Sequence, residues 1–209
     1  MALLNVLNPS DGSRRISSAS EDLVVLEGTQ ALTTLRGVGA AAGTGVSVKE
    51  SVFDAFHVTR FTFTNVAVPL ADAAGVVAYG GLKIYDFPVG YILVLSGCAD
   101  LALTKSSAGV NNDWDGDIGF GTVTASNNAT LSSTEQDIIP TTATPQASSG
   151  ATTGDCKNTA VAFLDGTSTA ADMFLNLLVD DADHDVTGTA CNLIVNGTLT
   201  LVWVNAGDN

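Results

Sequence analysis

The clearest candidate for chemistry is an acidic segment at residues 113–117, where three aspartates alternate with Trp and Gly. Carboxylate oxygens of Asp113, Asp115 and Asp117 at this spacing can surround a calcium ion. The glutamate that completes a helix-loop-helix calcium loop at the twelfth position is absent, because Thr124 stands there. The segment is therefore either a calcium site or an acidic turn whose side chains accept local hydrogen bonds. No other cofactor is expected.

A second acidic segment, residues 180–185, places His184 among four aspartates. Nearby carboxylates favour the protonated imidazole, so His184 has the charge of a general acid or the chemistry of a ligand. The sequence places no nucleophile beside it and contains no GxSxG motif. A solvated hairpin tip, or a contact with a basic neighbour, explains the segment better. We expect no enzyme, and we expect the other histidine, His57, to be a structural residue at the edge of a strand.

Trp114 lies between Asp113 and Asp115, and two interpretations of it are open. A large aromatic side chain on an acidic loop can anchor a protein–protein interface. It can equally pack over its own loop, because an aromatic ring buries a large apolar area. Trp203 lies in an apolar run and is expected in the core or on a sheet face.

The elements that must position these residues alternate between apolar and polar side chains with a period of two, which is typical of strands. In residues 57–64 we expect Val58, Thr59, Phe61 and Phe63 on one apolar face. Further strands are predicted at residues 46–49, 82–87, 91–95, 101–105, 118–124, 160–164 and 173–179. Residues 187–204 are long enough for a hairpin with a type I′ turn at an Asn-Gly pair, or for one long bent strand.

One segment, residues 131–139, is expected to be helical, with Ser132 or Ser133 as its N-cap and Pro140 after its end. About eight strands at short spacing with one short helix predict an all-β sandwich. We expect a jelly-roll-like β-sandwich over residues 46–209, with an immunoglobulin-like sandwich as the alternative.

Charge is distributed unevenly along the chain, which has a net charge of −14. Lys157 is the one cationic side chain after Lys105, against thirteen carboxylates in the same stretch. Such a surface cannot neutralise a nucleic-acid backbone and repels anionic lipid. We expect no nucleic-acid partner and no membrane partner, and no apolar run reaches the length of a membrane span.

Residues 1–45 differ from the rest and are expected to form an extended N-terminal arm. The segment has little apolar material for a core of its own and ends in a Gly- and Ala-rich stretch. A terminal segment of this kind is ordered when something holds it, so we expect a neighbouring subunit to do so. Arg14, Arg15 and Arg36 are the expected contacts with acidic partners. No apolar run follows Arg14 and Arg15, so we expect no signal peptide and synthesis in a cytosol.

Three cysteines, Cys98, Cys156 and Cys191, are far apart and form no CxxC pair. A bond between Cys156 and Cys191 is open, but three reduced thiols are favoured. Zinc is not expected, because neither histidine has a cysteine at ligand spacing.

Several segments resemble virion structural proteins of tailed bacteriophages, particularly those of marine hosts. The segments are Phe87–Gly90, Asp115–Thr122, Ala129–Glu135, Ile138–Pro140, Phe163–Thr167, Asp172–Asn176, Val179–Asp183 and Gly197–Trp203. They cover most of residues 57–204 and consist of turns and strands rather than a chemical signature. The arm, residues 1–45, lies outside the resemblance.

The resemblance implies a head decoration (cement) protein, jelly-roll-like and homotrimeric. Such a protein binds the major capsid protein on the outer surface of the head and bridges capsomers. It is made in the cytoplasm of the bacterial host and ends in the virion. Two alternatives remain open, a tail or fibre structural protein and a calcium- or glycan-binding β-sandwich module.

Overall fold

The computed structural model describes residues 15–19, 22–26, 38–39, 45–53, 56–72, 77–106, 108–158, 160–180 and 191–207. Strands make up most of this part of the chain, and its one helical element is a 3-10 turn. The described residues include no helix with the length and apolar character of a membrane span. The all-β prediction is therefore confirmed.

The elements follow in this order: β1 (Arg15–Ala19), β2 (Asp22–Leu26), β3 (Val38–Gly39), β4 (Val46–Phe53), β5 (Phe56–Asp72), β6 (Val77–Asp86), β7 (Gly90–Lys105), β8 (Gly116–Gly121), η1 (Ser133–Glu135), β9 (Ile139–Thr144), β10 (Ala151–Thr153), β11 (Cys156–Lys157), β12 (Ala162–Gly166), β13 (Asp172–Asp180) and β14 (Cys191–Asn205).

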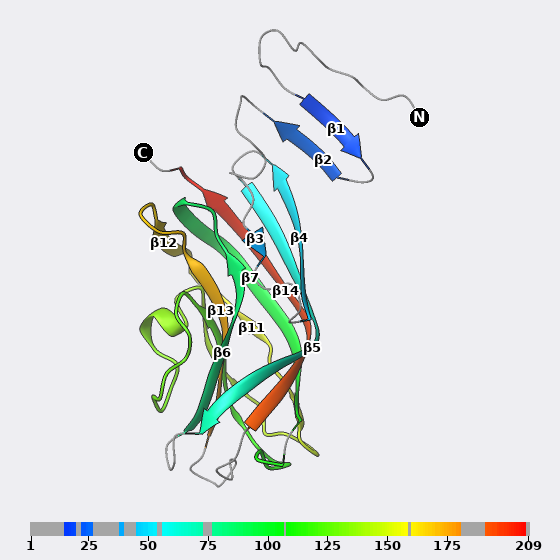
Figure 1. Ribbon diagram of the computed structural model, residues 1–209, viewed down its shortest axis with the longest axis vertical. Helices are drawn as coiled ribbons and strands as arrows, with labels where there is room; N and C mark the ends of the chain where they lie inside the picture. Colours follow the sequence, from blue (N-terminus) through cyan, green and yellow to red (C-terminus); the bar gives the residue numbers. More distant parts are fainter. Residues whose placement is uncertain are drawn as a thin grey trace.

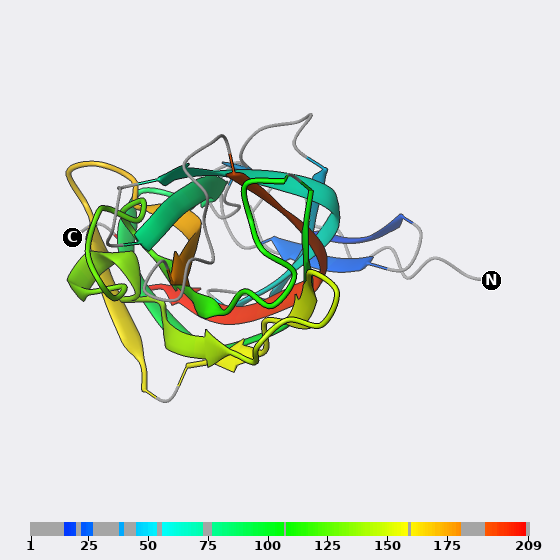
Figure 2. The same cartoon turned by 90° about the horizontal axis from the view of Figure 1, so that it is seen from below.

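Two groups of strands form a sandwich-like body (Figure 1). In one group β4, β5, β14 and β7 lie side by side, and β10, β11 and β12 pair with successive parts of β7. In the other group β6, β13, β8 and β9 are neighbours. The groups are joined where the end of β5 pairs with β6 at Ala71 and Asp72. Viewed along the long axis, the strands surround a common interior (Figure 2).

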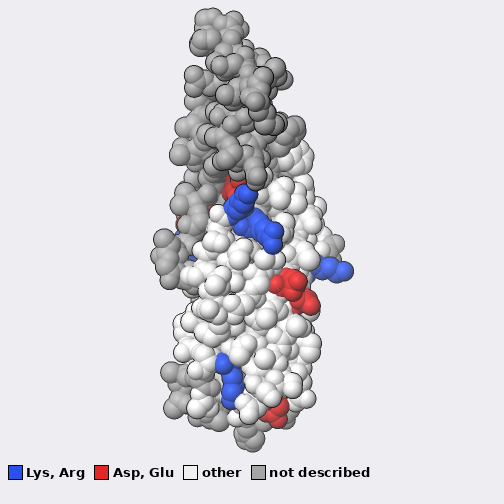
Figure 3. Space-filling model, turned by 90° about the vertical axis from the view of Figure 1, so that its right-hand side faces the viewer, with Lys and Arg blue, Asp and Glu red and all other residues white. Residues whose placement is uncertain are grey.

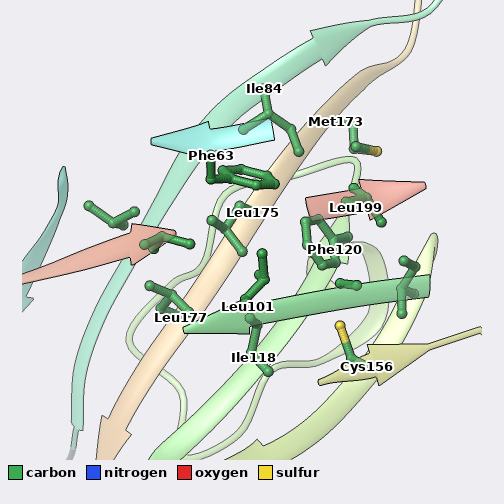
Figure 4. Packing of buried hydrophobic residues seen from close by; sticks show 14 of the residues in the cluster. Phe63, Ile84, Leu101, Ile118, Phe120, Cys156, Met173, Leu175, Leu177 and Leu199 are labelled. Atoms are coloured by element: carbon green, nitrogen blue, oxygen red, sulfur yellow. The ribbon is translucent and has the colours of Figure 1, made fainter. Parts of the chain in front are cut away.

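The core consists of the inward side chains of both groups. Phe63, Leu101 and Leu199 from the first group meet Ile118, Phe120, Leu175 and Leu177 from the second (Figure 4). Along β14 every second residue is buried up to its bulge and again after it. At about 25 cal/mol per Å² of apolar surface, this burial is the main stabilising contribution.

Residues 191–205 form one long strand, so the long-strand interpretation is confirmed and the hairpin is wrong. The register with β5 shifts between Val195 and Gly197, where Asn65 on β5 adopts a φ of 52°. The backbone N–H of Asn65 donates to Oδ1 of Asn196 at 2.8 Å. Gly197 has a φ of 129°, and a Cβ there would lie 2.2 Å from the carbonyl oxygen of Asp100. The Asn-Gly pair therefore makes a bulge instead of a turn.

The predicted helix over residues 131–139 is wrong in length and type, because only Ser133–Glu135 forms a single 3-10 turn. Ser132 is its N-cap residue, in agreement with one of the two expected caps. The rest of the segment is drawn into the sheet: the N–H of Ile138 donates to the carbonyl of Phe120 at 3.0 Å, and Ile139 begins β9. Tertiary contacts have overridden the local helical signal.

Candidate functional site

The outward surface of the first group of strands carries most of the exposed large hydrophobic side chains of the described residues. We call this surface, formed by outward residues of β4, β5, β14, β7, β11 and β12, the outer face. Of seven exposed large hydrophobics, four lie on it, Phe56, Val58, Leu95 and Phe163, and Val161 directly precedes β12. Contiguous apolar surface of this kind is uncommon on a monomeric protein and marks interaction sites.

Strand register places apolar residues directly opposite one another across four strands. Phe163 on β12 is opposite Leu93 on β7, Leu93 is opposite Val204 on β14, and Val204 is opposite Phe56 on β5. Phe163 is 60% exposed and Phe56 is 50% exposed. Tyr91 extends the row, because its ring stacks on that of Phe163 with centroids 5.5 Å apart. Apolar contact surface thus runs across β12, β7, β14 and β5.

A second apolar row lies beside the first. Val58 on β5 is opposite Val202 on β14, and Leu95 is the extra residue of a bulge in β7. Val58 was predicted to lie on the inward, apolar face of its strand. The prediction is wrong, because Val58 is 44% exposed. The inward residues of this part of β5 are instead His57 and Thr59.

Charged residues border the apolar rows in an ordered way. Lys49 on β4 is opposite Arg60 on β5, and Arg60 is opposite Thr200 on β14. Both cationic side chains are exposed, and no ion pair of either is found in the described part of the chain. On the other side of β14, Asp100 on β7, Asp155 just before β11 and Lys157 on β11 are also exposed. Figure 3 shows the surrounding surface as largely uncharged.

Beneath the outer face lies a buried polar cluster around His57. Nδ1 of His57 is 2.6 Å from Oε1 of Glu50, and the hydroxyl of Tyr85 donates to Oε2 of the same carboxylate. The imidazole stacks on the indole of Trp203 with centroids 3.7 Å apart. Trp203 in turn donates Nε1–H to Oγ1 of Thr59 at 2.9 Å.

This cluster fixes four strands against one another, because its members come from β4, β5, β6 and β14. His57 lies at the start of β5, as expected, but it is fully buried, and a structural role fits its contacts. Its Nε2 has no hydrogen-bond partner among the described residues. The cluster faces the interior and borders neither of the two depressions described next.

The acidic segment around Trp114 lines a small depression of about 180 Å³. Asp115 and Asp117 meet there with Asp180, whereas Asp113 is exposed and does not line it. Burial raises the pKa of Asp117, and the nearby charges of Asp180 and Asp115 raise it further. Among the residues that the structure describes, no group of three His, Cys, Asp or Glu side chains is arranged to hold a metal ion. Calcium binding by Asp113, Asp115 and Asp117 stays a prediction.

Asp180 is a member of this acidic group that was not predicted from the sequence. It joins because β13 pairs antiparallel with β8, with Val179 opposite Gly116. The N–H of Asp180 donates to the carbonyl of Asp115 at 3.1 Å. The only signal in the sequence was that both acidic segments border predicted strands.

Trp114 is a core residue, and the prediction that it anchors an interface is wrong. Its side chain is fully buried, and Nε1–H donates to the carbonyl of Gly150 at 3.1 Å. Of the expected arm contacts, Arg14 and Arg36 lie outside the described residues, and so does the side chain of Arg15. His184 also lies outside them.

A larger depression of about 360 Å³ lies at the end of β12, with Phe163 on its lining. Its carboxylates already have partners. Asp137 accepts hydrogen bonds from the backbone N–H and the hydroxyl of Thr122 at 2.8 and 2.7 Å. Burial raises the pKa of Asp137, and these hydrogen bonds oppose the rise. Asp172 is bridged to Asp86 by the ammonium of Lys83.

The three cysteines are free thiols, as favoured. Cys98 is exposed on the outer face, between Thr200 and Lys157. Cys156 points into the core, and burial raises its pKa to about 12. Cys191 is buried, and its thiol donates to the carbonyl of Gly109 at 3.4 Å.

No protein-family model matches the chain, and no curated protein matches it in sequence.

Proposed function

We propose that the chain is a structural subunit of a virion, and specifically a decoration protein on the outer surface of a tailed-phage head. The observation that carries this proposal is the outer face, where apolar side chains in direct register cross four strands. Burying such side chains against a partner stabilises an assembly in proportion to the apolar area removed from water. In a shell, neighbouring subunits can cover such an apolar surface.

The distribution of charge supports the same role. The chain carries a net charge of −14, while the outer face combines apolar rows with a few charges of both signs. Acidic surface that remains exposed keeps coated particles dispersed, because like-charged bodies repel one another. A contact surface with few charged side chains limits the desolvation of unpaired carboxylates.

In this proposal the N-terminal arm, residues 1–45, binds the major capsid protein, and Arg14, Arg15 and Arg36 meet carboxylates there. Cationic side chains contribute most where they pair with carboxylates that water no longer solvates. The β-sandwich then bridges neighbouring capsomers. The β-rich body suits this role because it is held by a large common core.

Capsid occupancy tests the proposal. Capsids that lack this protein are mixed with the full-length chain, with a chain lacking residues 2–44, and with the triple variant R14E/R15E/R36E. The copies bound per particle are counted by gel densitometry and cryo-electron microscopy, and circular dichroism confirms that each variant is folded. We expect the full-length chain to bind and both variants to lose most of their occupancy.

The variants separate two parts of the proposal. Undiminished binding of the shortened chain would rule out the arm as the anchor. Failure of the full-length chain to bind any capsid, under conditions in which it is folded, would rule out the decoration role itself.

A further inference from the structure

We infer that the larger depression, at the end of β12, is a binding site for a neutral sugar of one or two rings. Its volume of about 360 Å³ falls in the range of small-ligand sites, roughly 300–1,000 Å³. The inference goes beyond the virion role, since sugar binding needs no capsid. Two properties of the lining carry it, an exposed aromatic face and hydrogen-bonding groups that the fold already orients.

Phe163 provides the aromatic face. Its side chain lines the depression and is 60% exposed. Tyr91, which does not line the depression, stacks on the ring of Phe163 at an interplanar angle of 22°. One face of Phe163 is therefore held against Tyr91, and the other is available to a ligand. A pyranose has a face of C–H groups. Packing that face on an aromatic ring removes apolar surface from water and sets polarised hydrogens against the negative face of the ring.

The loop between β12 and β13 supplies further apolar lining and is fixed in place. Ala170 and Ala171 are part of the lining, and their short side chains leave room for a ligand. The N–H of Phe87 donates to the carbonyl of Ala171 at 2.9 Å. At the start of the loop, Oδ1 of Asp165 accepts the N–H and the hydroxyl of Thr167 at 3.2 and 2.7 Å. The depression is therefore preformed, which lowers the entropy cost of binding.

Asp137 and Asp165 supply oriented acceptors on the lining. Both oxygens of Asp137 are fixed by the N–H and the hydroxyl of Thr122, and each carboxylate oxygen accepts up to two hydrogen bonds. Asp137 therefore keeps acceptor capacity in a fixed plane, to which two neighbouring hydroxyls of a sugar can donate. Asp165 keeps Oδ2 for the same purpose, because the hydrogen bonds found for it in the described part of the chain are made by Oδ1. Preorganised acceptors of this kind give both orientation and specificity.

The arrangement of the carboxylates favours a neutral ligand over a cation. A metal ion gains most where several carboxylate oxygens converge on one point. Within the residues that the structure describes, no three His, Cys, Asp or Glu side chains converge in this way. Asp172, the third carboxylate on the lining, already pairs with the ammonium of Lys83 at 2.9 Å. Hydroxyls spread around a sugar ring instead match acceptors that lie apart.

Sugar titrations test the site directly. The probes are the methyl glycosides of glucose, galactose, mannose and N-acetylglucosamine, together with lactose and maltose, each titrated into the full-length, isotope-labelled chain. We expect at least one probe to bind with a Kd on the order of 1 mM, the strength of a shallow site with a single aromatic platform. Amide chemical shifts should change at Thr122, Asp137 and residues 163–172. The C–H protons of the sugar should show saturation transfer from the protein.

Matched variants assign the contacts. Phe163→Ala removes the aromatic face and should weaken binding about tenfold or more. Phe56→Ala removes a phenylalanine of similar exposure that does not line the depression, and it should leave binding unchanged. Asp165→Ala should weaken binding several-fold, whereas Asp113→Ala changes an exposed carboxylate outside the lining and should not. Thermal melts followed by circular dichroism confirm that every variant is folded.

Failure of every probe to shift the amide signals at its solubility limit would overturn the inference. So would unchanged binding by Phe163→Ala. Displacement of the bound sugar by an equal concentration of arginine amide would also overturn it, because the depression would then prefer a cation. Phe163 belongs to the outer face as well, so sugar binding is measured on the chain alone and capsid occupancy separately. Failure of sugar binding and failure of the decoration role are therefore distinguishable.

Discussion

Asn176 should hold the loop between β8 and β9 in place, and replacing it should destabilise the protein strongly. Its side chain is fully buried on β13. Oδ1 accepts the N–H of Ala125 at 2.8 Å, and Nδ2 donates to the carbonyls of Val123 and Glu135 at 2.8 and 2.7 Å. Three backbone groups of one loop thus depend on one amide. Gly81, opposite on β6, provides the room, since a Cβ there would lie 2.4 Å from Oδ1.

The variant Asn176→Ala loses three hydrogen bonds and leaves their backbone partners buried. At about 1 kcal/mol for each hydrogen bond, the free energy of unfolding should fall by roughly 3 kcal/mol. For a chain of this size, 1 kcal/mol corresponds to about 2–4 °C, so Tm should fall by about 6–12 °C. Differential scanning calorimetry at one fixed protein concentration measures the change, and hydrogen exchange should become faster in residues 122–136.

Two further variants sharpen the test. Asn127→Ala, on the exposed part of the same loop, should leave Tm nearly unchanged. Asn176→Asp keeps the acceptor but sets a carboxylate against two carbonyl oxygens, so it should be at least as destabilised at pH 7 and should recover partly in acid. If Asn176→Ala melted within about 1 °C of the wild type, the loop would be held by other contacts, and the reasoning from hydrogen bonds would be refuted.

Two other predictions concern buried titratable groups. The pKa of Asp117 is raised in the folded state, so its favourable contribution to the free energy of unfolding is complete below the ordinary pKa of 3.8 and is lost as pH rises through the folded pKa. The variant Asp117→Asn should therefore raise Tm slightly at pH 7 and leave Tm unchanged near pH 3. An equal rise in Tm at both pH values would contradict this. The pKa of Cys156 is raised to about 12, so only about one thiol in ten thousand is ionised at pH 8. In dilute native protein, iodoacetamide should modify Cys98 and spare Cys156, as read by peptide mass spectrometry, and rapid modification of Cys156 would show that it is not buried in solution.

Period-two alternation was sufficient to predict the long buried strands. Met173–Val179 and Tyr91–Leu95 lie within β13 and β7 as expected, although only Ile92 and Val94 of the second run are buried in the core. Among the strands after residue 45, those that were missed, β9, β10 and β11, are short or rich in Thr. Pro140 was interpreted as the end of a helix but lies within β9. It is tolerated there because β9 is at the edge of the sheet, where a missing N–H leaves no ladder bond unmade.

The outer face could not be predicted, because it depends on which strands are neighbours. Phe56, Leu93 and Phe163 are far apart in sequence and meet through the register of β12, β7, β14 and β5. The predicted inward face of β5 was also wrong at Val58, and this concealed part of the outer face. His57 is polar and was not predicted to point inward, yet it lies beside Glu50 in the interior, so Val58 points outward.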